Sequence, residues 1–295
     1  MFIINNRKFF FILSAILVVA SFFSVWKYGF NLGIDFKGGS VLEVSYASVR
    51  PQKDLVSAEL EKLGLGNFIL TPSSDKNFIL KTRELSPVEK TVVMSAFQKD
   101  SENVAKEERF SSIGPVVGDQ LKNKAMVAIA IVIICILLFV TFAFRKVSNP
   151  VASWKYGLVT IVALLHDVVI PTGLFVAYSH FTGAEIDLLF VSAILAILGY
   201  SVHDTIVVFD RVRESLKDHA KGTFDVVVGD SLMKTMSRSI NTSLTTFITL
   251  LSLYFIGGET TKDFAFLLLI GILVGTYSSI FVASPLLVTL EKLQK

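Results

Sequence analysis

The chain has 295 residues, of which 52% are hydrophobic, and its mean hydropathy is +0.62. This composition is well above that of soluble globular proteins and indicates several membrane-spanning helices. The formal net charge of +3 gives no indication of nucleic-acid binding, and the single cysteine, Cys135, excludes an intramolecular disulfide.

The first apolar segment, residues 9–26, follows the basic residues Arg7 and Lys8. It could be a cleaved signal peptide or a retained helix. The apolar run is long for a signal peptide, and no A-x-A cleavage pattern follows it. We therefore expect a retained transmembrane helix within residues 1–27, with its basic end in the cytosol.

Residues 28–124 differ in kind, because charges of both signs are nearly balanced and the apolar runs are short. Between Lys27 and Lys124 the chain carries 14 Lys or Arg and 13 Asp or Glu. Helical spacing follows Pro51 and Ser86, and strand-like alternation occurs in residues 39–47, 67–70, 76–85 and 109–117. The order β-α-β-β-α-β predicts a small ferredoxin-like α+β domain, which we expect to be extracytoplasmic.

Five further apolar segments follow within residues 125–295, and each is long enough to span a membrane. They cover residues 125–144, 156–178, 188–209, 239–256 and 264–290. Loops rich in Lys and Arg alternate with loops that carry mainly acidic residues. The chain is therefore predicted to be a polytopic membrane protein with six transmembrane helices and both termini in the cytosol.

The segment GYSVHDTIVVFDRVRE, residues 199–214, places His203 and Asp204 inside the fourth apolar helix. An ionised carboxylate at bilayer depth costs roughly 2.5–3.5 kcal/mol on insertion scales. Arg238 and Ser239 open the fifth helix at the same edge and are the expected partners. Two interpretations stay open, a static ion pair with Arg238 and a proton-titrating pair. His203 points about 100° away on a helix, which favours a packing or polar-lining role.

Hydroxyl residues continue from Arg238 along the fifth helix at alternating steps of four and three. They are Thr242, Thr245, Thr249 and Ser252. This spacing predicts one polar stripe, which could line a hydrated path or hold helices together.

His166 and Asp167 lie near the middle of the third helix. They are either a second proton-relay element or a buried hydrogen-bonded pair. Together with His180, His203 and His219, His166 lacks the spacing of metal ligands, so we expect no metal site and no cofactor. In the sixth helix, Gly271 and Gly275 form a G-x-x-x-G pattern that predicts close helix packing.

The segment NLGIDFKGGS, residues 31–40, follows the first helix and contains Gly33, Asp35, Gly38 and Gly39. The glycines permit positive φ and close backbone approach. No phosphate-loop pattern accompanies them. We interpret the segment as a shaped connector between the membrane and the domain.

Four segments together resemble the SecD/SecF family of protein-export membrane proteins, part of the resistance-nodulation-division (RND) superfamily. NLGIDFKGGS resembles the family's signature after its first helix, and GYSVHDTIVVFDRVRE its fourth-helix motif. ALLHDVVIPTG (residues 163–173) and SRSINTSLTT (residues 237–246) are similar to its third and fifth helices.

The resemblance implies the SecF half of an RND-type core in the plasma membrane of a prokaryote, with a separate SecD supplying the other half. Such a protein is not an enzyme but uses the proton motive force to complete translocation of secreted polypeptides. Asp204 and Arg238 would serve proton transport, with His166 and Asp167 as further relay candidates. The implied partners are SecD, the SecYEG translocon, YajC, the unfolded polypeptide and membrane lipid. The alternatives are an RND-type small-molecule or lipid exporter half and a structural accessory of the translocon.

Overall fold

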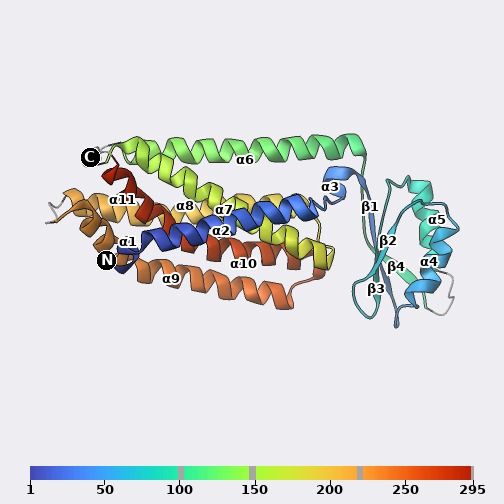
Figure 1. Cartoon of the computed structure of the whole chain (residues 1–295). Helices are drawn as coiled ribbons and strands as arrows, with labels where there is room; N and C mark the ends of the chain where they lie inside the picture. Colours follow the sequence, from blue (N-terminus) through green and yellow to red (C-terminus); the bar gives the residue numbers. More distant parts are fainter. Residues whose placement is uncertain (99–102, 146–150, 218–221, 294–295) are drawn as a thin grey trace. The chain divides into compact units, whose positions relative to one another are not determined.

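The computed structural model describes residues 1–98, 103–145, 151–217 and 222–293 (Figure 1). The chain divides into two compact units. One consists of Met1–Asn31 and Val127–Lys295 and is helical, and the other consists of Leu32–Met126 and contains the sheet.

Six helices among the described residues are long and apolar enough to cross a membrane, as the sequence predicted. They follow the short helix α1 (Phe2–Asn5) and are α2 (Arg7–Tyr28), α6 (Pro115–Ala143), α7 (Ser153–Thr182), α8 (Leu188–Lys217), α9 (Phe224–Ile256) and α10 (Glu259–Ser278). The last of these continues through a π-helical turn, η1 (Ser279–Ala283), into α11 (Ser284–Lys292).

Several helices extend beyond the apolar segments that predicted them. Helix α8 runs to Lys217 rather than 209, and α9 begins at Phe224 rather than 239. At the polar end of α8, Nη1 of Arg211 lies 2.5 Å from Oε2 of Glu214. Such a pair three residues apart stabilises the helix in a segment that is no longer apolar. The expected boundaries were wrong because they followed the apolar stretch alone.

Small residues bring the helices of the first unit into close contact. A Cβ on Gly173 of α7 would lie 2.4 Å from the Cα atom of Ser21 in α2. A Cβ on Gly271 or Gly275 of α10 would lie 2.2 Å and 3.1 Å from side-chain atoms of α8. The predicted close packing at Gly271 and Gly275 is therefore confirmed, and α8 and α10 are held tightly enough to share buried polar contacts.

The second unit has the β-α-β-β-α-β order that the sequence predicted. Its strands are β1 (Gly39–Tyr46), β2 (Ile69–Pro72), β3 (Asn77–Thr82) and β4 (Ala105–Ile113), and its helices are α3 (Ile34–Lys37), α4 (Lys53–Glu61) and α5 (Pro87–Phe97). The sheet order is β2-β3-β1-β4, and all neighbouring strands are antiparallel.

The core of this unit follows from the alternation in the strands. Leu42 and Val44 of β1 and Phe78 of β3 are buried together with Leu60 of α4 and Phe97 of α5. Helices α4 and α5 therefore supply the apolar residues that cover the sheet (Figure 1). The last strand ends at Ile113 rather than 117, since Gly114 and then Pro115 of α6 follow it.

Candidate functional site

Asp204 lies on the inner side of α8, where only 7% of the residue is exposed. Its Oδ1 accepts a hydrogen bond of 2.5 Å from the hydroxyl of Ser239 in α9. Its Oδ2 is also buried and has no hydrogen-bond partner among the described residues. A buried oxygen without a hydrogen-bond partner is most costly when it carries charge. Oδ2 is therefore the carboxyl oxygen that is available to bind a proton.

Arg238 and His203 are both exposed, although each is next to a residue of the buried contact. No ion pair joins Asp204 to Arg238 in the part of the chain that the structure describes, so the static ion pair, one of the two interpretations left open by the sequence, is not formed there. Both side chains act on Asp204 electrostatically. The direct contact instead comes from Ser239, one residue further along α9.

The predicted polar stripe lies on the side of α9 that this chain leaves exposed. Thr245 donates a hydrogen bond of 2.9 Å to the carbonyl of Thr242, and Thr249 donates one of 3.0 Å to that of Thr245. Ser252 donates to the carbonyl of Ile248 at 3.3 Å. Because these hydroxyls bond to their own helix, the stripe holds no two helices together within the described residues.

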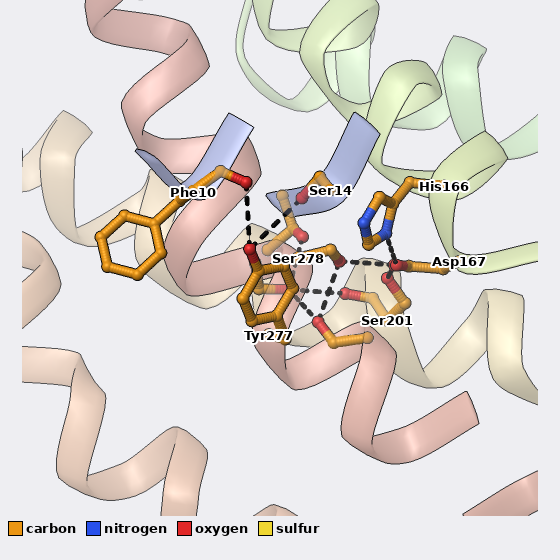
Figure 2. Close-up of polar contacts among 10 residues, drawn as sticks. Phe10, Ser14, His166, Asp167, Ser201, Tyr277 and Ser278 are labelled. Atoms are coloured by element: carbon orange, nitrogen blue, oxygen red, sulfur yellow. Dashed lines mark hydrogen bonds and ion pairs between the residues drawn. The ribbon is translucent and has the colours of Figure 1, made fainter. Parts of the chain in front are cut away.

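Asp167 is the centre of a second buried polar cluster, and its own exposed fraction is 0% (Figure 2). Its Oδ2 accepts hydrogen bonds from Ser201 of α8 and, at 2.6 Å, from Ser278 of α10. Its Oδ1 lies 2.9 Å from Nδ1 of His166. Both carboxylate oxygens of Asp167 are therefore paired, in contrast to those of Asp204.

The cluster around Asp167 extends to α2 through an aromatic side chain. The ring of His166 stacks on Tyr277 with centroids 6.0 Å apart, and its Nε2 is buried without a partner among the described residues. The Tyr277 hydroxyl donates to the carbonyl of Phe10 at 3.1 Å and accepts from Ser14 at 3.3 Å (Figure 2). One polar cluster thus connects α2, α7, α8 and α10.

Further hydroxyl groups on α8, α9, α10 and η1 accompany the two carboxyls. Thr205 follows Asp204 in the sequence, and Ser279 follows Ser278, which donates a hydrogen bond to Asp167. The hydroxyl oxygens of Thr205 and Ser279 lie 2.9 Å apart. On the other side, Ser243 bonds to the Ser239 carbonyl at 2.8 Å and to the Thr276 hydroxyl at 2.5 Å. The sequence interpretation missed most of these contacts. The run TYSS at residues 276–279, polar within an apolar helix, is the signal that could have found them.

The signature glycines lie at the start of the second unit, beside the one-turn helix that contains Asp35. Gly38 has φ +77°, and a Cβ there would lie 2.8 Å from the backbone of Pro115. Gly39 has φ +135°, and a Cβ would lie 2.7 Å from the Thr82 carbonyl oxygen. A side chain is thus sterically excluded at both positions, which favours the interpretation of Gly33 to Gly39 as a structural connector.

No group of three or more His, Cys, Asp or Glu side chains that could share a metal ion occurs in residues 1–98, 103–145, 151–217 and 222–293. His219 lies outside these residues.

Comparison with known proteins identifies the family. The family model described as "Protein export membrane protein SecD/SecF, C-terminal" matches residues 92–293. A second family model, "SecD/SecF GG Motif", matches residues 23–48, which include Gly38 and Gly39. The chain belongs to the SecD/SecF family. It is accordingly a multi-pass membrane protein of a protein-export family, and the resemblance inferred from the sequence is confirmed.

Within the SecD/SecF family, the chain is similar to proteins named as the SecF subunit. It is 40% identical to the protein translocase subunit SecF of Thermobaculum terrenum, over 98% of this chain and 93% of that protein. It is 39% identical to that of Calditerrivibrio nitroreducens, over 99% and 94%. The crystal structure of SecDF from Thermus thermophilus matches with a TM-score of 0.82 at 32% identity. That match covers 98% of this chain and 38% of the SecDF chain.

Proposed function

We propose that this chain is the SecF partner of a SecD protein and that it uses proton flow to drive a step of protein export. The observation that carries the proposal is the half-paired carboxyl of Asp204, whose Oδ1 is bound by Ser239 while Oδ2 is buried and unpaired. An ionisable group at membrane depth is costly and typically serves ion transfer. Asp204 therefore carries the proton, and Oδ2 is the atom that receives it.

Arg238 supplies the charge that releases the proton. It is exposed beside Ser239, within electrostatic range of Asp204 but without an ion pair to it. A small movement of α9 against α8 that brings the guanidinium to Oδ2 stabilises the ionised form. Each proton that crosses 100 mV supplies about 2.3 kcal/mol, which is enough to bias such a movement.

The exposed polar side of α8 and α9 supports association with SecD. His203, Arg238 and the stripe from Thr242 to Ser252 all face away from the rest of this chain. A charged side chain in a membrane segment requires a protein or water partner. We propose that SecD covers this side and that the stripe then lines the hydrated path to Asp204. SecYEG, YajC and the unfolded polypeptide remain partners proposed from the family resemblance.

The test is an export assay in membrane vesicles, with and without a proton gradient. Asp204→Asn keeps the size of the side chain and still accepts a hydrogen bond, but it fixes the neutral state. It should assemble with SecD and lose the proton-dependent part of export. Asp210→Asn is the matched control, because Asp210 lies on the same helix and is exposed. Arg238→Lys should retain part of the activity, since a point charge replaces the planar guanidinium.

Full proton-dependent export by an assembled Asp204→Asn variant would contradict the proposal. The chain would then be a structural accessory of the translocon. Proton-dependent efflux of a small molecule or lipid with unaffected protein export would instead favour an RND-type exporter half.

His166 and Asp167 are proposed as a second relay element. The unpaired Nε2 of His166 supports this role, and the full pairing of Asp167 supports the alternative of a fixed structural pair. His166→Gln separates the two. A relay role requires reduced proton-dependent export in a variant of normal stability, whereas a fixed pair requires reduced stability with export preserved per folded molecule.

We also propose that both termini are cytosolic and that residues 28–124 are extracytoplasmic in the plasma membrane. The positive loops support this orientation. In a Cys135→Ala background, the Ser73→Cys variant should react with a membrane-impermeant maleimide in intact cells. Labelling only after lysis would show that the orientation is the opposite of the one proposed.

A further inference from the structure

An apolar groove lies between the C-terminal end of α6 and the N-terminal end of α7, away from both buried carboxyls. It has a volume of about 790 Å³. Its walls include Leu137, Leu138 and Phe142 of α6, and Leu158 and Ile161 of α7. Several of these side chains are exposed, among them Leu138 at 63% and Phe142 at 61%. The groove therefore opens outward from the helical unit.

The groove has a closed floor because the two helices touch. A Cβ on Gly157 of α7 would lie 2.5 Å from Oγ1 of Thr141 and 3.1 Å from Cδ1 of Leu137, both in α6. Glycine at this position allows the close approach. The groove is thus a trough on a helix–helix contact, suited to a flexible chain that can follow its apolar walls.

One end of the groove is positively charged. The guanidinium of Arg145 lies over the ring of Phe142 at 3.8 Å from its centroid and has no carboxylate partner in the part of the chain described. Helix α7 begins at this end without a hydrogen bond from a capping side chain, which leaves a partial positive charge on its first turn. Trp154, exposed at 58%, completes this end with a side chain typical of the membrane–water interface.

We propose that this groove binds a phospholipid with an anionic headgroup. One acyl chain lies along the apolar trough, and the phosphate contacts Arg145 and the first turn of α7. Charge complementarity selects this occupant, because a cation at the interface end of an apolar trough matches a phosphate attached to a hydrocarbon chain. A transmembrane helix of a partner is about 10 Å wide and would additionally need an acidic residue opposite Arg145.

The test is native mass spectrometry of the purified full chain with phosphatidylglycerol or phosphatidylcholine of identical acyl chains. Wild type should retain phosphatidylglycerol about fivefold better, as expected from the roughly 1 kcal/mol contributed by one cation near an anionic headgroup. Arg145→Gln should abolish the preference. Lys217→Gln, which removes an equal charge at an exposed position outside the groove, should keep it. Leu158→Trp should reduce binding of both lipids by filling the trough.

Equal retention of the two lipids by wild type would overturn the proposal, as would an Arg145→Gln variant that keeps the preference. Unchanged lipid binding by a monodisperse Leu158→Trp protein would show that no acyl chain occupies the groove. A photo-crosslinking aromatic residue at Leu158 provides a second measurement in cells. A crosslink to phospholipid supports the proposal, and a crosslink to a polypeptide identifies a protein interface and refutes it.

Discussion

Replacing Gly173 with alanine is expected to destabilise the helical unit by about 1–3 kcal/mol, the usual cost of overpacking. The added Cβ would lie 2.3 Å from the Cβ and 2.4 Å from the Cα of Ser21. Favourable carbon–carbon contacts require about 3.5–4.0 Å, so α2 must move by more than 1 Å. Because the obstacle is backbone rather than the end of a side chain, no rotamer change relieves the clash.

A hydrogen bond adds to the cost of this substitution. Ser24 donates to the Gly173 carbonyl at 2.8 Å, and separation of the helices lengthens that bond. Such interhelical bonds contribute about 0.6 kcal/mol on average in membrane proteins. Alanine gains up to about 1 kcal/mol in helix propensity over glycine, which offsets part of the loss.

The effect is measured by heating the detergent-purified chain and determining, by size-exclusion chromatography, the fraction that stays folded at each temperature. Gly199→Ala is the matched control, because no atom outside the adjoining backbone of its own helix lies within 4 Å of a Cβ built there. It should be neutral or stabilising. Adding Ser21→Gly to Gly173→Ala should recover only part of the loss, since the Ser21 Cα remains. Equal stability of Gly173→Ala and Gly199→Ala would refute the close contact between α2 and α7.

Two further outcomes concern the polar groups. Asp167→Ala should lower the unfolding temperature more than Asp167→Asn, because alanine leaves the Ser201 hydroxyl without its acceptor and leaves Ser278 with the Gly275 carbonyl alone; equal losses would contradict this. In the second unit, hydrogen bonds from Arg83 and then from Ser86 hold the pKa of Glu89 at about 2, below its ordinary 4.5. Because the folded-state pKa is depressed, this stabilisation is present above about pH 5 and is lost as the pH falls toward 2. Hydrogen exchange of α5, corrected for intrinsic rates, should follow this change in wild type and less in Glu89→Gln.

The sequence was sufficient to predict the six helices and the order of the sheet unit, since both depend on local patterns. Continuous apolar runs identify spans, and alternation in residues 39–47 identifies β1. Asp204 was found because a carboxyl inside an apolar run is unusual. These patterns can be recognised in the sequence without knowledge of how the helices pack.

The partners of Asp204 could not be predicted in the same way. Arg238 and Ser239 are adjacent and differ by about 100° around α9, so the side of α9 that meets α8 decides which one reaches the carboxyl. That choice depends on tertiary packing. The contacts of Asp167 have the same origin, because Ser201 and Ser278 come from two other helices.

The π-helical turn at Ser279–Ala283 also determines which chain lengths are compatible with this bundle. A π turn contains about one residue more than an α turn, so it rotates α11 by about 100° relative to an uninterrupted helix. With this offset, Ser278 before the turn and Leu287 after it are both buried. If the same residues continued as an uninterrupted α-helix, Leu286 and Leu290 would face the interior in place of Leu287 and Glu291. Deletion of one residue within the turn would instead remove the extra residue and leave the facing of α11 unchanged. Natural variation in the length of this segment should therefore be limited to one residue, with the π turn present in the longer form and absent in the shorter one.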